Sequence, residues 1–135
     1  MSSNLADLFI AANVGIMVFF TVAVAPTIFT ALPPQWSAAY VRKFFPRYFM
    51  FLGVTTVAAF GFAVQLDYSK AYQWTLLACA LVFFLNCFWL TPRINKARDE
   101  GQDTTFKALH WASVSLNMIQ LIAFIWMLIP ARPSL

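Results

Sequence analysis

The sequence predicts an all-α integral membrane protein, a bundle of four transmembrane helices in a single domain over residues 1–135. Two observations carry this prediction. Hydrophobic residues make up 61% of the chain and charged residues only 10%, whereas soluble domains are about 25% charged. In addition, four long intervals carry no charged side chain. Because so few charges cannot cover the surface of a soluble domain, lipid is expected to cover it.

The charge-free intervals place the helices. They contain 34, 19, 22 and 24 residues and lie between Asp7 and Arg42, Arg47 and Asp67, Lys70 and Arg93, and Lys107 and Arg132. A transmembrane helix needs about 20 apolar residues, so each interval accommodates one. Two consecutive prolines, Pro33 and Pro34, end the first helix. The expected spans are about 5–31, 46–66, 71–91 and 106–129.

The segment at about 34–44 is expected to form a short interfacial helix between the first two spans. Three aromatic residues recur every four positions on one face of it, namely Trp36, Tyr40 and Phe44. Such side chains favour the headgroup region of a bilayer. After the third span, residues 93–100 are expected to extend the helix until Gly101 ends it.

Lysine and arginine residues set the expected orientation. Seven lie in the loops after the first and third spans, namely Arg42, Lys43, Arg47, Arg93, Lys96, Arg98 and Lys107. Only Lys70 and Arg132 lie on the other side. Cytoplasmic loops are enriched in these residues, so both termini are expected on the outer side, in a bacterial inner membrane. The basic residues are therefore interpreted as topology signals among membrane lipids, and no nucleic-acid partner is expected.

Neutral polar residues, rather than acids or bases, are expected inside the bundle. On the fourth helix His110, Ser113, Asn117 and Gln120 fall within about 80° of arc. This stripe should face other helices, because polar groups are costly against lipid, and we expect it to meet Asn86. Hydrogen bonds that join the helices and a ligand site both remain open. Ion-coupled pumping is disfavoured, because it usually requires charged side chains in the membrane.

A candidate ligand site lies at the expected cytoplasmic mouth. Arg47 and Arg93 each follow a proline, and a planar guanidinium can bind a phosphate, a lipid headgroup or a carboxylate. The alternative is that both only anchor the topology. The candidate ligand-binding residues are Arg47, Arg93, Asn95, His110, Ser113, Asn117 and Asn86. His110 is also a candidate metal ligand.

Cysteines and glycines on the predicted helices indicate packing. Cys79 and Cys87 are separated by about 12 Å of helical rise, too far for a disulfide, so free buried thiols are expected. Gly53 and Gly61 lie near one face of the second helix, which indicates close helix packing or, alternatively, a contact between copies in a homo-oligomer. The sequence contains no phosphate-binding loop, paired-cysteine motif or Ser/His/Asp set, so an enzyme is disfavoured.

Four segments together resemble the TMEM205-like family, also called DUF4149. They are VAPTIF at 24–29, FPRYF at 45–49, PRINKARD at 92–99, and the segment from Phe106 to Asn117. The resemblance covers about residues 8–128 and implies a four-helix membrane protein without an established catalytic role for any residue. The animal relative is associated with resistance to platinum drugs, which implies export or trafficking of soft-metal compounds. The matching positions are Pro26, Pro46, Arg47, Pro92, Arg93, Asn95, His110, Ser113 and Asn117.

Three functions are compatible with these features. The first is a non-enzymatic membrane protein that binds or moves a small molecule or a soft metal, with ligands drawn from Met17, Cys79, Cys87, His110 and Met118. The second is a haem- or quinone-linked membrane redox enzyme, which usually needs more than the single histidine present. The third is a small accessory subunit of a larger membrane complex. A homo-oligomer is also compatible with the sequence.

Overall fold

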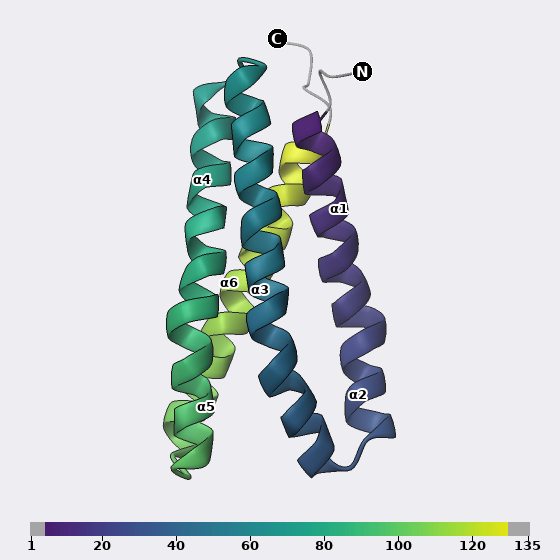
Figure 1. The fold of residues 1–135 in the computed structure, drawn as a ribbon, viewed down its shortest axis with the longest axis vertical. Helices are drawn as coiled ribbons and strands as arrows, with labels where there is room; N and C mark the ends of the chain where they lie inside the picture. The colour runs from purple at the N-terminus through teal and green to yellow at the C-terminus, as the bar shows by residue number, and fades with distance from the viewer. Residues whose placement is uncertain (1–4, 130–135) are drawn as a thin grey trace.

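Four antiparallel helical spans form the bundle that the computed structural model describes over residues 5–129 (Figure 1). The first consists of α1 (Leu5–Phe19), the π-helical turn η2 (Phe20–Val24) and α2 (Ala25–Ala31), and the second is α3 (Pro34–Gln65). The third consists of α4 (Lys70–Leu85), the π-helical turn η3 (Asn86–Leu90) and α5 (Thr91–Asp99), and the fourth is α6 (Asp103–Leu128). All four are long and apolar enough to cross a membrane. The predicted all-α fold with four spans is confirmed.

The spans pack in a ring. α3 lies between α1 and α4, and α6 closes the ring by contacting α4 and α5 on one side and α1 on the other. Figure 1 shows that α6 is tilted: it lies behind α5 at one end of the bundle and beside α1 at the opposite end. As a result α6 does not pack against α2, the part of the first span that lies at the same end of the bundle as α5. No Cα atom of α2 lies within 8 Å of a described Cα of α5 or α6.

The second span differs from the sequence prediction. A separate interfacial helix at about 34–44 and a span at about 46–66 were expected, but α3 is one helix that continues through Pro46. Packed aromatic rings bridge the proline, because the ring centroid of Phe44 lies 5.8 Å from that of Tyr40 and 5.4 Å from that of Tyr48. The prediction was wrong because a helix in lipid keeps its backbone hydrogen-bonded, and neighbouring packing then tolerates a proline.

The third span extends further than a single charge-free interval indicates. The expected extension over 93–100 is present as α5, which ends at Asp99, and Gly101 follows it with a φ of 68°. A positive φ at this position is typical of a glycine that terminates a helix. At the other end of the span, the Ser69 side chain accepts a hydrogen bond from the Tyr72 amide at 3.3 Å and caps α4.

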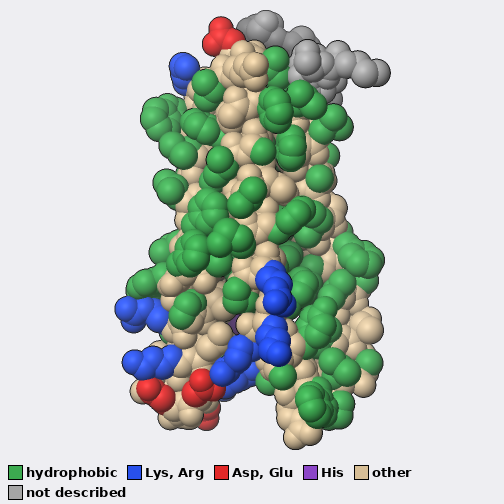
Figure 2. Space-filling model, in the orientation of Figure 1, with side chains coloured by type: hydrophobic (Ala, Val, Ile, Leu, Met, Phe, Trp, Pro, Cys, Tyr) green, Lys and Arg blue, Asp and Glu red, His purple; other side chains and the backbone are tan. Residues whose placement is uncertain are grey.

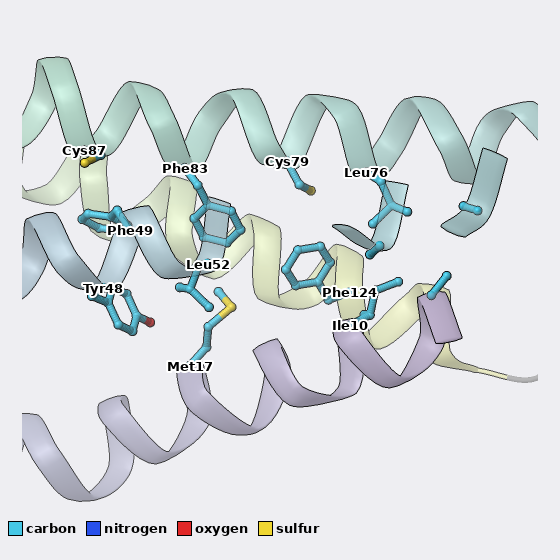
Figure 3. Close-up of a cluster of buried hydrophobic side chains, with 13 residues drawn as sticks. Ile10, Met17, Tyr48, Phe49, Leu52, Leu76, Cys79, Phe83, Cys87 and Phe124 are labelled. Carbon is cyan, nitrogen blue, oxygen red and sulfur yellow. The ribbon is translucent and has the colours of Figure 1, made fainter. Parts of the chain in front are cut away.

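The core lies in the half of the bundle where α1, α3, α4 and α6 all meet. Figure 3 shows side chains from these four helices directed toward one another, including Ile10, Met17, Leu52, Phe83 and Phe124, which are fully buried. Phe83 and Phe124 pack with ring centroids 6.0 Å apart. Since lipid is as apolar as these side chains, close packing rather than the hydrophobic effect holds such helices together.

Charged side chains collect at the end of the bundle formed by α2, α5 and the start of α3. Figure 2 shows Lys and Arg gathered there, with hydrophobic side chains over most of the remaining length of this face. α1 begins and α6 ends at the opposite end (Figure 1). We refer to the first end as the basic end.

Candidate functional site

Prolines lie within three of the four spans, in the half toward the basic end. Pro26 and Pro92 each follow a π-helical turn by two residues, and Pro46 lies inside α3. A proline cannot donate the backbone hydrogen bond of the helix, and its ring displaces the carbonyl four residues earlier. π-Turns are rare and occur often at functional sites. Here they separate the tightly packed half of the bundle from the half that opens toward the basic end.

A cavity of about 340 Å³ occupies the open half. Its volume lies within the range of about 300–1,000 Å³ that is typical of small-molecule sites. Most of the wall is apolar and aromatic, from Phe20, Ala25, Phe29, Val41, Phe45, Phe49, Ile94, Phe106, Val114 and Met118. The polar wall residues are Thr21, Thr91, Asn95, Arg98, His110, Ser113 and Asn117. Four spans therefore contribute to one amphipathic cavity.

The polar stripe of α6 faces the bundle interior, as predicted. Ser113 Oγ donates a hydrogen bond of 2.6 Å to Asn86 Oδ1 in η3, and Gln120 Nε2 donates one of 2.8 Å to the Cys79 carbonyl. The expected meeting with Asn86 is thus made by Ser113. Asn117 lines the cavity and is 91% buried, but its Oδ1 is covered by protein and lies beside the Tyr48 hydroxyl rather than facing the cavity.

Arg98 and Asn95 lie where the cavity approaches the basic end. The Arg98 guanidinium lies 5.0 Å from the ring centroid of Phe106, a cation–π contact that holds it at the cavity wall. Arg42 from α3 forms an ion pair with Asp99 and donates to the Asn95 carbonyl at 3.5 Å. These contacts tie α3 to α5 below the cavity. Thr91, Ile94, Asn95 and Arg98 lie on one face of α5, at helical spacing, and all line the cavity.

The predicted ligand residues separate into two groups. Asn95, His110, Ser113 and Asn117 line one cavity, and Asn86 is bonded to it through Ser113. Arg47 and Arg93 are exposed and do not line it. Arg93 instead lies 4.3 Å over the ring of Trp89. These two arginines were predicted as ligand residues because each follows a proline. The helical spacing of Thr91, Asn95 and Arg98 would have identified Arg98.

Two of the five predicted soft-metal ligands line the cavity, and the other three lie elsewhere. Cys79 and Cys87 are buried free thiols, as predicted, and Cys87 Sγ donates to the Pro46 carbonyl at 3.4 Å. His110 and Met118 line the cavity, whereas Met17 lies in the core. Within residues 5–129 no three His, Cys, Asp or Glu side chains lie close enough to hold a metal ion.

Residues 8–103 match the model of DUF4149, a domain of unknown function. The chain belongs to this family. No curated protein and no solved structure matches it. The DUF4149 match runs from α1 through α5 and ends at the first residue of α6. It therefore includes both π-turns, the three prolines within the spans and the α5 wall of the cavity, whereas the polar stripe of α6 lies beyond it.

Proposed function

We propose that this DUF4149 protein is a non-enzymatic membrane protein that binds a small amphipathic molecule in the cavity at the basic end. One observation carries the proposal. The cavity has an apolar and aromatic wall together with a few polar side chains along α6 and α5, among them Asn95, Arg98 and His110. Specific small-molecule sites combine these features. The apolar part of the ligand packs on the aromatic wall, and its polar group lies against the polar side chains of α5 and α6.

The basic end faces the cytoplasm in this proposal. Loops on the cytoplasmic side of a membrane are enriched in lysine and arginine, and the side chains of both types gather at the end opposite the start of α1 (Figure 2). The ligand therefore binds in the inner half of the membrane, and both termini lie outside. Membership of the TMEM205-like branch is part of the proposal and is supported by the segments at 92–99 and 106–117.

The other predicted functions have less support. A soft-metal cargo lacks a ligand cluster within the described residues. A haem needs axial ligands, and the only histidine, His110, stacks on Phe106 with ring centroids 5.8 Å apart and planes at 11°. The roles of accessory subunit and homo-oligomer stay predictions, as does the bacterial inner membrane.

A pair of tryptophan substitutions on α6 tests the proposal. Val114→Trp places a large side chain in the cavity, whereas Ile119→Trp adds the same side chain at an exposed position of the same helix. Native mass spectrometry of the protein released from mild detergent should detect a retained small molecule on the parent and on Ile119→Trp, and its loss from Val114→Trp. Equal retention by both variants, or an empty parent protein, would contradict the proposal.

A further inference from the structure

We infer that the cavity takes an elongated, single-chain anionic amphiphile from the membrane, with its acidic head at Arg98 and Asn95 and its chain against the aromatic wall. This inference rests on the proposed function and names the ligand class. It draws on three features: an arginine without an acidic partner at the mouth, a long wall that is apolar on one side, and an opening toward lipid.

The mouth presents an arginine that forms no ion pair within residues 5–129. Asp99, the acidic residue next to Arg98, is paired with Arg42, and the charge of Arg98 acts on Asp99 only at longer range. The Arg98 guanidinium lies instead over the Phe106 ring. A guanidinium fork binds carboxylate and phosphate groups through two parallel hydrogen bonds. The mouth is therefore suited to a carboxylate or phosphate head.

The cavity wall on α6 extends along about three turns of the helix. It begins at Phe106, beneath the Arg98 guanidinium, and continues through His110 and Ser113 to Asn117. Eleven residues of α-helix correspond to about 16 Å of rise. Opposite this wall lie aromatic rings from three elements of the first two spans, namely Phe20, Phe29, Phe45 and Phe49. A compact soluble anion would leave most of this wall without contact, whereas an extended hydrocarbon chain covers it.

The ligand has a route from the lipid phase. α2 approaches α3, but none of its Cα atoms lies within 8 Å of a described Cα of α5 or α6. The cavity is lined by α2 on one side of this separation and by α6 on the other. Phe29 stands at its edge and is 61% exposed. The cavity therefore reaches the protein surface at Phe29, and in this inference an amphiphile from the leaflet at the basic end enters there.

Photolabelling in nanodiscs tests the inference. The probe is palmitic acid with a photoreactive diazirine in mid-chain, compared with the matching fatty alcohol, in phosphatidylcholine nanodiscs. Mass spectrometry of the labelled peptides locates the adducts. The acid should label cavity residues of α3 and α6 at about tenfold lower concentration than the alcohol. Palmitate and lysophosphatidate are competitors, and the one effective at the lower concentration distinguishes a carboxylate head from a phosphate head.

Two arginines on α5 provide the matched variants. Arg98→Gln should bring labelling by the acid to the level of the alcohol, Arg98→Lys should retain most of the preference, and Arg93→Gln should leave it unchanged, because Arg93 lies over Trp89 outside the cavity. Displacement of the probe by inorganic phosphate or acetate would overturn the inference in favour of a soluble anion. Equal labelling by acid and alcohol overturns the inference but leaves the proposed function standing. Failure of both probes to label the cavity contradicts both.

Discussion

Ser113 Oγ donates a hydrogen bond of 2.6 Å to Asn86 Oδ1 and joins α6 to the π-turn η3 beside the cavity. Both residues are buried, at 7% and 0% exposure. Asn86 Nδ2 also donates to the Val82 carbonyl of its own helix at 3.4 Å. The bond therefore joins the α6 wall of the cavity to the π-turn of the third span. Within the described residues, only the first and third spans contain a π-turn.

Ser113→Ala should destabilise the bundle, because Asn86 Oδ1 then stays buried without its donor. Hydrogen bonds between membrane helices contribute about 0.6 kcal/mol on average and up to about 1.7 kcal/mol, so we expect a loss of about 1 kcal/mol. Ser115→Ala is the control, since Ser115 is exposed on the same helix. Equal unfolding midpoints for the two variants would show that the bond does not stabilise the bundle.

The two native thiols supply the measurement. Cys79 and Cys87 are free and only 6% and 7% exposed. A fluorogenic thiol-reactive dye should therefore react slowly with the folded protein and rapidly once it unfolds. A dye that labels either cysteine quickly at low temperature would contradict the packing of α4 and η3.

The sequence predicts the number and ends of the spans better than their internal geometry. Charge-free intervals locate four helices because lipid excludes charge along about 20 residues, and the ends of the first and fourth spans agree with prediction to within three residues. Pro26 and Pro92 predict a disturbance of the helix, but they do not predict the π-turn that precedes each of them. At Pro46 the expected break in the helix is absent. The aromatic rings around this proline pack against Phe20 from the first span, and the sequence alone does not predict that contact.

The candidate site was predictable in part for a similar reason. Helical periodicity places His110, Ser113 and Asn117 on one face, and that face lines the cavity. Periodicity also places Arg98 on the α5 face of Thr91 and Asn95, but it does not show that this face turns toward α6. Phe106 holds the Arg98 side chain at the cavity wall. The Arg42 side chain is held by Asp99, which lies 57 positions later in the chain. Contacts this distant in sequence follow only from how α3, α5 and α6 pack.

Thr56→Val should destabilise the contact between α1 and α3. Asn13, which is fully buried, donates from Nδ2 to Thr56 Oγ1 at 3.0 Å and accepts from Thr55 Oγ1 at 2.7 Å. Valine keeps the shape of threonine but removes the acceptor, so we expect a loss of about 1–2 kcal/mol. Thr27→Val is the control, because its exposed hydroxyl bonds only to the Ala23 carbonyl of its own helix. Similar unfolding midpoints for both variants would contradict the prediction.

Tyr72→Phe should loosen the end of the bundle opposite the basic end. The Tyr72 hydroxyl donates to Asp7 Oδ1 at 2.5 Å and ties α4 to α1. Hydrogen bonds to a charged partner contribute about 1.5–3 kcal/mol, and partial exposure reduces this to about 1 kcal/mol. Tyr40→Phe, at an exposed tyrosine of the basic end, should change the thiol-dye midpoint much less. The reverse order would contradict this assignment.

Stability should fall at alkaline pH through Tyr68, which also donates to Asp7, at 3.4 Å, from the connection between α3 and α4. Burial raises the pKa of Tyr68 above its usual 10.0, and the Asp7 carboxylate raises it further. A raised pKa means that the contribution is complete below about pH 10 and is lost as the pH rises through the folded-state value. Tyr68→Phe should show a smaller loss of stability above pH 10 than the parent, measured by urea unfolding followed by circular dichroism. An unchanged alkaline slope would contradict the prediction.

Gly53→Ala and Gly61→Ala should have opposite effects on stability. A Cβ atom at Gly53 meets the Phe84 ring of α4 at 2.8 Å, whereas one at Gly61 has open space around it. Overpacking costs about 1–3 kcal/mol, while alanine in place of glycine stabilises an unhindered helix by about 0.5–1 kcal/mol. In a Phe84→Leu background the ring is gone, so Gly53→Ala should no longer be destabilising, and the double-mutant cycle measures this coupling directly. Absence of coupling would mean that Gly53 is small for a reason other than the approach of α4.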